Sequence, residues 1–190
     1  SYMLNSIGLT YVLVVYVVLN VFYSVKLKNI IILDVVLIAI SFFLRILAGG
    51  IATNTKLSYW IIIMVFLLAL FLAFAKRRDE VIVFEQTNVK VRKNIANYSI
   101  KMLNALLIGV AVLIIVFYFL YTFSDEVVEQ FNSHYVYLTS PFVILGILRY
   151  LSLIKKRVLY ANPTQILIKD HYMKLIVLGW IVSFYIIIYL

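Results

Sequence analysis

Apolar residues run along this chain in six long stretches, which are separated by shorter segments that hold most of the charged side chains. The apolar stretches cover residues 7–23, 29–52, 57–75, 102–123, 136–154 and 171–190. Each approaches the roughly 20 residues that a helix needs to cross the hydrocarbon core of a bilayer. The runs are continuous and do not alternate with polar residues, which favours helices over a barrel. The pattern therefore predicts an all-α, polytopic transmembrane helix bundle with six spans.

The composition excludes a soluble domain. Of 190 residues, 65% are hydrophobic and 13% are charged, whereas soluble domains are about half apolar and about a quarter charged. The chain has no cysteine, so it has no disulfide, thiolate metal site or cysteine nucleophile. Spans and short connections use almost every residue. We therefore predict one transmembrane domain over residues 1–190, whose longest connection, about 76–101, forms a cap at the membrane surface.

The basic residues gather on one side of the predicted membrane. They follow the first, third and fifth spans, at Lys26, Lys28, Lys76, Arg77, Arg78, Lys90, Arg92, Lys93, Lys101, Lys155, Lys156, Arg157 and Lys169. The opposite side has Lys56 and the acidic stretch 125–129. Because cytoplasmic loops carry the positive excess, we expect residues 76–101 and 155–170 to be cytoplasmic and 124–135 to face the other side. Topology thus explains the net charge of +9, and nucleic-acid binding is not needed.

Four charged residues, Asp34, Arg45, Arg149 and Lys174, fall inside predicted spans, where they must face protein or water. Asp34 and Arg45 share one face of the second span, about 16 Å apart along the helix axis, and cannot touch. Asp34 lies near the cytoplasmic end, within reach of Lys28, and a structural and a functional role are equally open for it. Snorkelling toward the interface explains Arg45, and it explains Arg149 at least as well as ligand binding does.

A cluster of three basic and two acidic residues, Lys76-Arg77-Arg78-Asp79-Glu80, closes the third span. On a continuing helix Lys76, Asp79 and Glu80 occupy one arc, while Arg77 and Arg78 point elsewhere, and we expect Arg78 to face lipid headgroups. Two carboxylates beside a cation suit a magnesium diphosphate. The alternative is an interfacial stop-transfer cluster with local ion pairs, which the pentapeptide alone favours.

Three segments together resemble the UbiA superfamily of intramembrane prenyltransferases: Tyr-Ser-Val-Lys-Leu-Lys at 23–28, Phe-Leu-Arg-Ile-Leu-Ala-Gly-Gly at 43–50, and Ala-Lys-Arg-Arg-Asp-Glu at 75–80. With Ile-Leu-Arg-Tyr at 147–150, the chain is similar to the decaprenyl-phosphate phosphoribosyltransferase branch over essentially its whole length. The resemblance implies nine transmembrane helices around a cavity open to the cytoplasm. Six spans correspond to the last six, so three helices and the first aspartate-rich, Mg²⁺-holding motif are expected before Ser1.

The resemblance implies transfer of a 5-phosphoribosyl group from phosphoribosyl pyrophosphate to a polyprenyl phosphate, with release of pyrophosphate, in cell-envelope glycan precursor synthesis. The site would face the cytoplasm at a bacterial inner membrane. Lys76, Asp79 and Glu80 would be catalytic, with Asp79 and Glu80 as Mg²⁺ ligands beside the expected upstream motif. On this account residues 1–190 alone are inactive.

Other residues receive phosphate-binding or supporting roles from the same resemblance. Tyr23, Lys28, Lys76 and Arg77 would hold phosphate oxygens, and Asp34, Arg45 and Arg149 would support them, with Asp34 orienting Lys28. Two alternatives stay open. One is a UbiA-type enzyme that joins a polyprenyl diphosphate to an aromatic acceptor. The missing Asp-x-x-x-Asp motif, in whose place Lys76 to Glu80 stand, argues against it. The other is a non-catalytic membrane protein or small-solute transporter.

Overall fold

The computed structural model describes residues 2–25, 27, 30–87, 95–155 and 169–189. In these ranges six helical segments are long and apolar enough to cross a membrane. They are α1 (Tyr2–Val25), α2 (Leu33–Thr53), α3 (Tyr59–Thr87), α4 (Ile100–Thr122), the 3-10 helix η3 (His134–Thr139) followed by α6 (Ser140–Lys155), and α8 (His171–Tyr189). The prediction of an all-α transmembrane bundle with six spans is confirmed, and the six apolar segments indicate an integral membrane protein.

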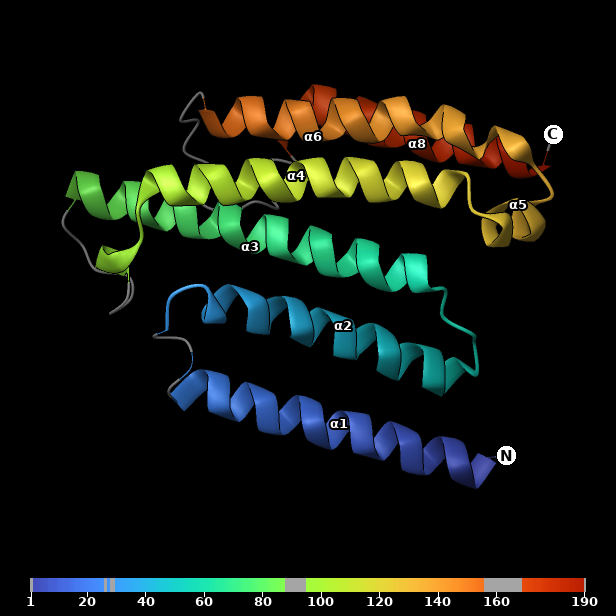
Figure 1. Cartoon of the computed structure of the whole chain (residues 1–190), viewed down its shortest axis with the longest axis horizontal. Coiled ribbons are helices and arrows are strands. Elements are labelled where there is room, and N and C mark those ends of the chain that lie inside the picture. Colours follow the sequence, from blue (N-terminus) through green and yellow to red (C-terminus); the bar gives the residue numbers. More distant parts are fainter. Residues whose placement is uncertain (1, 26, 28–29, 88–94, 156–168, 190) are drawn as a thin grey trace. The chain divides into compact units, whose positions relative to one another are not determined.

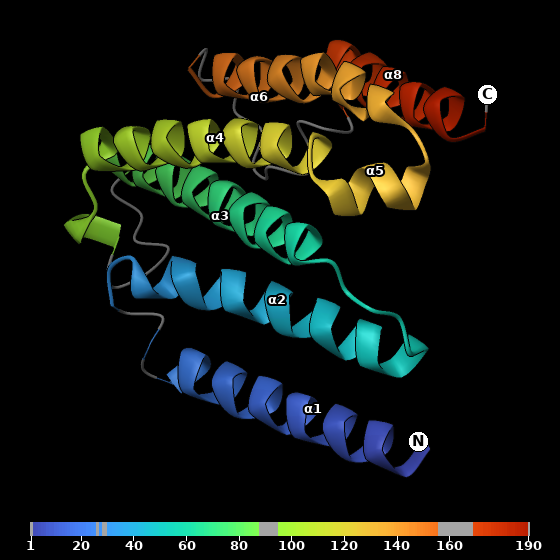
Figure 2. The same cartoon turned by 45° about the vertical axis from the view of Figure 1, so that its right-hand side comes forward.

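The helices form two compact units, residues 1–110 and 111–190. In the first unit α1, α2 and α3 lie side by side in chain order, so that α2 contacts both of its neighbours (Figure 1 and Figure 2). The boundary between the units falls inside α4, which begins in the first and ends in the second. One transmembrane domain over residues 1–190 therefore stays a prediction.

The third helix is longer than the sequence pattern indicated. We predicted a span over 57–75, but α3 continues to Thr87. A helix of 29 residues is about 43 Å long, which exceeds the roughly 30 Å hydrocarbon core. The charged cluster 76–80 therefore lies within a continuous helix that extends beyond the predicted span. The first part of the predicted cap is a continuation of α3, and residues 88–94 of that cap lie outside the described residues.

The chain returns toward α4 through the short 3-10 helix η2 (Ile95–Asn97), which packs against α3. Ile95 is completely buried, and Tyr98, directly after η2, is 5% exposed. Apolar burial at both ends of this short turn holds the connection against the helix ends. As a result, the start of α2, the end of α3 and η2 meet at one end of the first unit.

The second unit contains a short helix that the hydropathy pattern did not predict, α5 (Asp125–Phe131). It ends at Asn132, whose φ of 48° lies in the left-handed region that Asn tolerates better than most residues. Farther along, α6 and α8 pack side by side (Figure 1). The Tyr118 hydroxyl at the end of α4 hydrogen-bonds Thr139 Oγ1 at 2.7 Å and accepts from Trp180 Nε1 at 2.8 Å. One phenol thus joins three segments of this unit.

The first testable prediction concerns membrane topology. Lys101 and Asp125 are both exposed and flank the two ends of α4, which at 23 residues is about 34 Å long. Because the chain lacks cysteine, Lys101→Cys and Asp125→Cys can be labelled singly. We expect an impermeant maleimide to label position 101 in inside-out vesicles only and position 125 in right-side-out cells only. Labelling of both positions from the same side would contradict the assignment.

Candidate functional site

Polar and charged side chains from three distant parts of the sequence meet at one end of the first unit. This charged end consists of Asp34 at the start of α2, the cluster Lys76 to Glu80 near the end of α3, and Tyr98 after η2. Because these residues are far apart in the sequence, no single sequence motif contains all of them.

Asp34 is the centre of the charged end. Its side chain is fully buried, and both carboxylate oxygens are used: Arg77 Nε donates to Oδ2 at 2.7 Å, and the Tyr98 hydroxyl donates to Oδ1. A buried carboxylate requires such partners because its loss of hydration is otherwise uncompensated. The residue that we expected it to meet, Lys28, lies outside the described residues. The partner that the structure gives Asp34 is Arg77.

Arg77 extends this arrangement by one turn of helix. It is 1% exposed, and while its Nε bonds Asp34, its Nη1 donates to Glu80 Oε2. The planar guanidinium suits two fixed carboxylates at once. We predicted that Arg77 binds donor phosphates, and that role stays a prediction. In the structure, Arg77 holds the Glu80 carboxylate through the hydrogen bond from its Nη1.

Arg78 does not face lipid, so that expectation is wrong. The residue is 7% exposed, its Nε donates to Asn104 Oδ1 at 2.6 Å, and its Nη1 lies 3.8 Å from Asp79 Oδ1. The physical reason is that Asn104 on α4 lies against this side of α3, and helical angles alone carry no information about a neighbouring helix. Asn104, a polar residue inside an apolar span, was the available signal that a polar partner was needed there.

Exposure differs among the five residues of the cluster. Lys76 is exposed, and the side chains of Asp79 and Glu80 are 32% and 13% exposed, while Arg77 and Arg78 point into the protein. This face therefore offers one cation and two carboxylates to a water-borne ligand, with a buried network directly behind it.

Tyr98 is the member of the charged end that sequence reasoning missed. Besides donating to Asp34, its hydroxyl accepts a hydrogen bond from the Ile32 backbone N–H at 2.8 Å. Burial and the hydrogen bond to Asp34 raise the pKa of Tyr98, so the phenol stays protonated and remains a donor. A tyrosine at the end of an apolar run resembles an interfacial anchor, which is why the sequence alone did not distinguish it.

Two further predicted residues, Tyr23 and Arg45, belong to α1 and α2. Tyr23 is half-buried near the end of α1. Arg45 Nη2 donates to the Tyr16 hydroxyl at 2.7 Å, and its guanidinium carbon lies 5.4 and 5.3 Å from the ring centroids of Tyr16 and Phe42. This side chain is thus held by aromatic groups on α1 and α2. The interactions of Arg45 thus keep it apart from the charged end, whereas Tyr23 lies close enough to Arg77 to interact with it electrostatically.

Arg149 forms an ion pair in the second unit. Its Nε and Nη2 donate to the two carboxylate oxygens of Asp170 at 3.2 and 2.7 Å, and it lies over the ring of Tyr172. The hydrogen bonds from Arg149 lower the pKa of Asp170. Asp170 also accepts from the Met173 N–H at 2.8 Å, which caps the first turn of α8. The structure thereby gives Arg149 a role in joining α6 to the start of α8.

The carboxylates of the charged end fit only part of a magnesium site. Within the described ranges, no three acidic or histidine side chains cluster closely enough to hold a metal ion. Mg²⁺ usually takes one or two protein carboxylates together with substrate phosphates. Asp79 and Glu80 could supply that share, although one Glu80 oxygen already accepts from Arg77.

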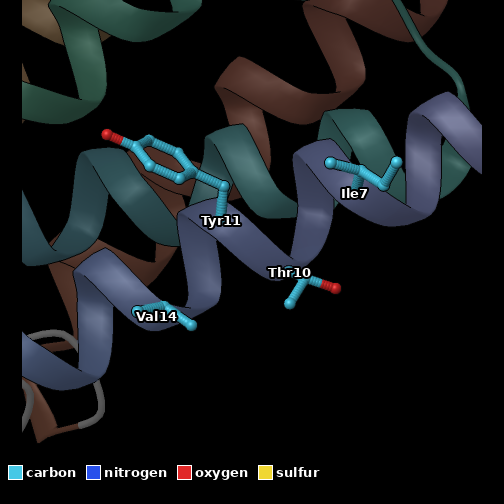
Figure 3. Close-up of a pocket in the computed structure, with 4 residues that line it drawn as sticks. All are labelled: Ile7, Thr10, Tyr11 and Val14. Carbon is cyan, nitrogen blue, oxygen red and sulfur yellow. The ribbon is translucent and has the colours of Figure 1, made fainter.

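A separate shallow pocket on α1 does not have the properties of a phosphate site. Ile7, Thr10, Tyr11 and Val14, all from one helix, line it (Figure 3). Its polar groups are the hydroxyls of Thr10 and Tyr11, and its lining has no charged side chain to neutralise an anionic donor.

The described residues thus form apolar helices of an integral membrane protein, with a buried ionic network and a mixed-charge face at one end of the first unit. No model of a known protein family matches the chain. Curated proteins named decaprenyl-phosphate phosphoribosyltransferase are nonetheless similar to it. That of Mycolicibacterium smegmatis is 30% identical over 181 residues, that of Corynebacterium glutamicum 27% over 187, and that of Mycobacterium tuberculosis 27% over 176.

These alignments include 92%, 98% and 93% of this chain but only 56%, 56% and 57% of the relatives. The chain thus spans little more than half the length of the curated relatives it matches. The predicted resemblance to the decaprenyl-phosphate phosphoribosyltransferase branch is confirmed.

The second testable prediction concerns the buried ion pair. Asp34→Ala leaves Arg77 without one of its two carboxylate partners, and the loss of one partner of a buried pair costs about 3 kcal/mol. We expect this loss in the free energy of unfolding, measured by denaturant titration in detergent micelles. The exposed Glu129 provides the control, since Glu129→Ala should change stability by less than about 0.5 kcal/mol. Equal stability of the two variants would show that the ion pair does not support the fold.

Proposed function

We propose that the protein transfers a 5-phosphoribosyl group from phosphoribosyl pyrophosphate to a polyprenyl phosphate of the decaprenyl type and releases pyrophosphate. The observation that carries the proposal is the similarity to proteins of that name over nearly all of this chain. The accessible arc of Lys76, Asp79 and Glu80 supports it, because it offers both charges that an anionic sugar donor requires.

In this reaction the bond between the ribosyl C1 and the pyrophosphate oxygen breaks, and a bond from C1 to an oxygen of the lipid phosphate forms. The lipid phosphate is already anionic, so it needs no strong base to act as the nucleophile. The main demand on the protein is to hold two anionic substrates together while negative charge develops on the leaving pyrophosphate.

Lys76 meets part of that demand as the exposed cation of the arc, placed to neutralise donor phosphate oxygens. Asp79 and Glu80 orient ribose hydroxyls or hold Mg²⁺, which would neutralise the pyrophosphate when bound. Arg77 fixes the Glu80 carboxylate from behind. Tyr23 and Lys28 are proposed to hold the lipid phosphate.

The proposed site lies at the cytoplasmic surface of a bacterial inner membrane. The excess of Lys and Arg in the connections after the first, third and fifth spans supports this side. The location suits both substrates, since the donor is water-borne and the acceptor's phosphate lies in the headgroup layer. The polyprenyl tail would extend between the apolar helices.

The third testable prediction addresses the activity itself. We expect the complete gene product, purified with Mg²⁺, to convert phosphoribosyl pyrophosphate and decaprenyl phosphate into a lipid-extractable phosphoribosyl product. Residues 1–190 alone should be inactive, because they cover only about 56% of the relatives' length and so lack part of the expected site. The readout is radiolabel from the donor in the organic phase. Full activity of residues 1–190 would refute the need for further helices, and no activity of the complete product would refute the proposed function.

The fourth testable prediction concerns the accessible arc. In the complete gene product, Lys76→Ala and Glu80→Gln should each lower kcat by roughly a hundredfold, the scale seen when one preorganised electrostatic contact is lost. Matched controls are Lys101→Ala and Glu85→Gln, which change exposed residues of the same types at the start of α4 and near the end of α3. Both controls should stay within about twofold of the parent enzyme.

Steady-state assays of equally folded variants would decide the question. Equal losses at the arc and control positions, or no loss at positions 76 and 80, would favour a stop-transfer cluster without a catalytic role.

A further inference from the structure

Tyr98 holds the start of α2 with two hydrogen bonds from a single hydroxyl. The hydroxyl accepts a hydrogen bond from the Ile32 N–H, just before α2, and donates one to the Asp34 carboxylate in the first turn of α2. The phenol is attached to the end of the η2 connection, and its residue is 5% exposed. A connection that is 64 residues away from Asp34 in sequence therefore fixes the position of that carboxylate.

The backbone at Ile32 provides a second and independent observation. Its φ is 66°, in the left-handed region that a β-branched residue rarely adopts. Such a conformation persists only where surrounding contacts over-determine it, and it is typical of functional sites. The contacts here are the hydrogen bond from the Ile32 N–H to the Tyr98 hydroxyl and the one from the Leu33 N–H to the Ile31 carbonyl at 2.7 Å. The strained residue thus lies two positions before Asp34, and Tyr98 contacts both.

From Asp34 the contacts continue in one direction. Arg77 donates to Asp34 from one nitrogen and to Glu80 from another. Asp34 and Arg77 are 0% and 1% exposed, whereas the Glu80 side chain is 13% exposed. The chain of contacts that starts at Tyr98 therefore reaches the accessible arc at Glu80. Linked polar groups in a buried setting strengthen one another, so a change at one end alters the geometry at the other.

We propose that Tyr98 is a positioning residue for phosphoribosyl transfer, which acts through Asp34 and Arg77 to set the orientation of the Glu80 carboxylate. The inference rests on the proposed function and adds to it the residue that controls the arc. Tyr98 itself contacts neither substrate. Its hydroxyl is already used by Ile32 and Asp34, and the residue is buried behind the arc.

The chain offers a closely matched control in Tyr118. This phenol is also buried, at 6% exposure, and also makes two hydrogen bonds, to Thr139 and Trp180 in the second unit. Tyr98→Phe and Tyr118→Phe each remove one buried hydroxyl and leave the ring in place. Both should lose stability for the same reason, but only the first has a described path to Glu80.

The fifth testable prediction is a double-mutant cycle in the complete gene product with Mg²⁺, phosphoribosyl pyrophosphate and decaprenyl phosphate. Tyr98→Phe should lower kcat about tenfold while KM for decaprenyl phosphate changes less than twofold, and Tyr118→Phe should leave kcat within twofold. In a Glu80→Gln background, Tyr98→Phe should cause no further loss of kcat, because residues that act as a unit are not additive. Losses that multiply, or equal losses for the two phenylalanine variants, would overturn the proposal.

The same variants test the network without activity. In denaturant titrations, the stability losses of Tyr98→Phe and Glu80→Gln should be non-additive, whereas those of Tyr118→Phe and Glu80→Gln should add. Additive losses in the first cycle would overturn the coupling even if the enzyme is active. If the complete gene product transfers no phosphoribosyl group but the first cycle is non-additive, the proposed function is wrong. The energetic coupling between Tyr98 and Glu80 is then confirmed, but it would serve a different activity.

Discussion

The ion pair between Asp34 and Arg77 connects the start of α2 with the end of α3, and the rest of the charged end is organised around it. Two ions removed from water recover their lost hydration only when their remaining donors and acceptors are also satisfied. The Tyr98 hydroxyl donates a hydrogen bond to Asp34 Oδ1, and Glu80 Oε2 accepts one from Arg77 Nη1. The pair therefore recruits one residue from η2 and one from the next turn of α3. Its complete set of partners orders side chains that would otherwise adopt many rotamers.

Hydropathy and helical periodicity predicted most of the fold, because the bilayer leaves few alternatives. Every backbone polar group in the hydrocarbon must be paired within its own segment, so a long apolar run already determines a helix. Periodicity also grouped Lys76, Asp79 and Glu80 on one arc, and these three are more exposed than Arg77 and Arg78. It missed α5, whose seven residues are too short to give a hydropathy signal, and the last three turns of α3, where charged residues still continue the helix.

The partners within the charged end were beyond the reach of sequence reasoning. Arg78 was expected to face lipid and instead contacts Asn104, since the angle of a residue on its own helix does not reveal which helix lies opposite. Asp34 was recognised as unusual, but its partner Arg77 lies 43 residues away. Tyr98 has the same local pattern as an interfacial anchor. Long-range pairing of polar groups depends on how helices pack, and a single sequence contains that information only indirectly.

The length of α3 has a consequence for how a lipid substrate meets a water-borne one. Lys76 follows Tyr59, the first residue of this helix, by a rise of about 26 Å at 1.5 Å per residue. That rise is close to the thickness of the hydrocarbon core. Under the proposed function, the arc would lie at the level of the lipid phosphates, and a polyprenyl phosphate would reach it while its tail stays in the bilayer. The number of apolar residues before Lys76 also fixes the direction of the arc, because one added residue would turn it by about 100°.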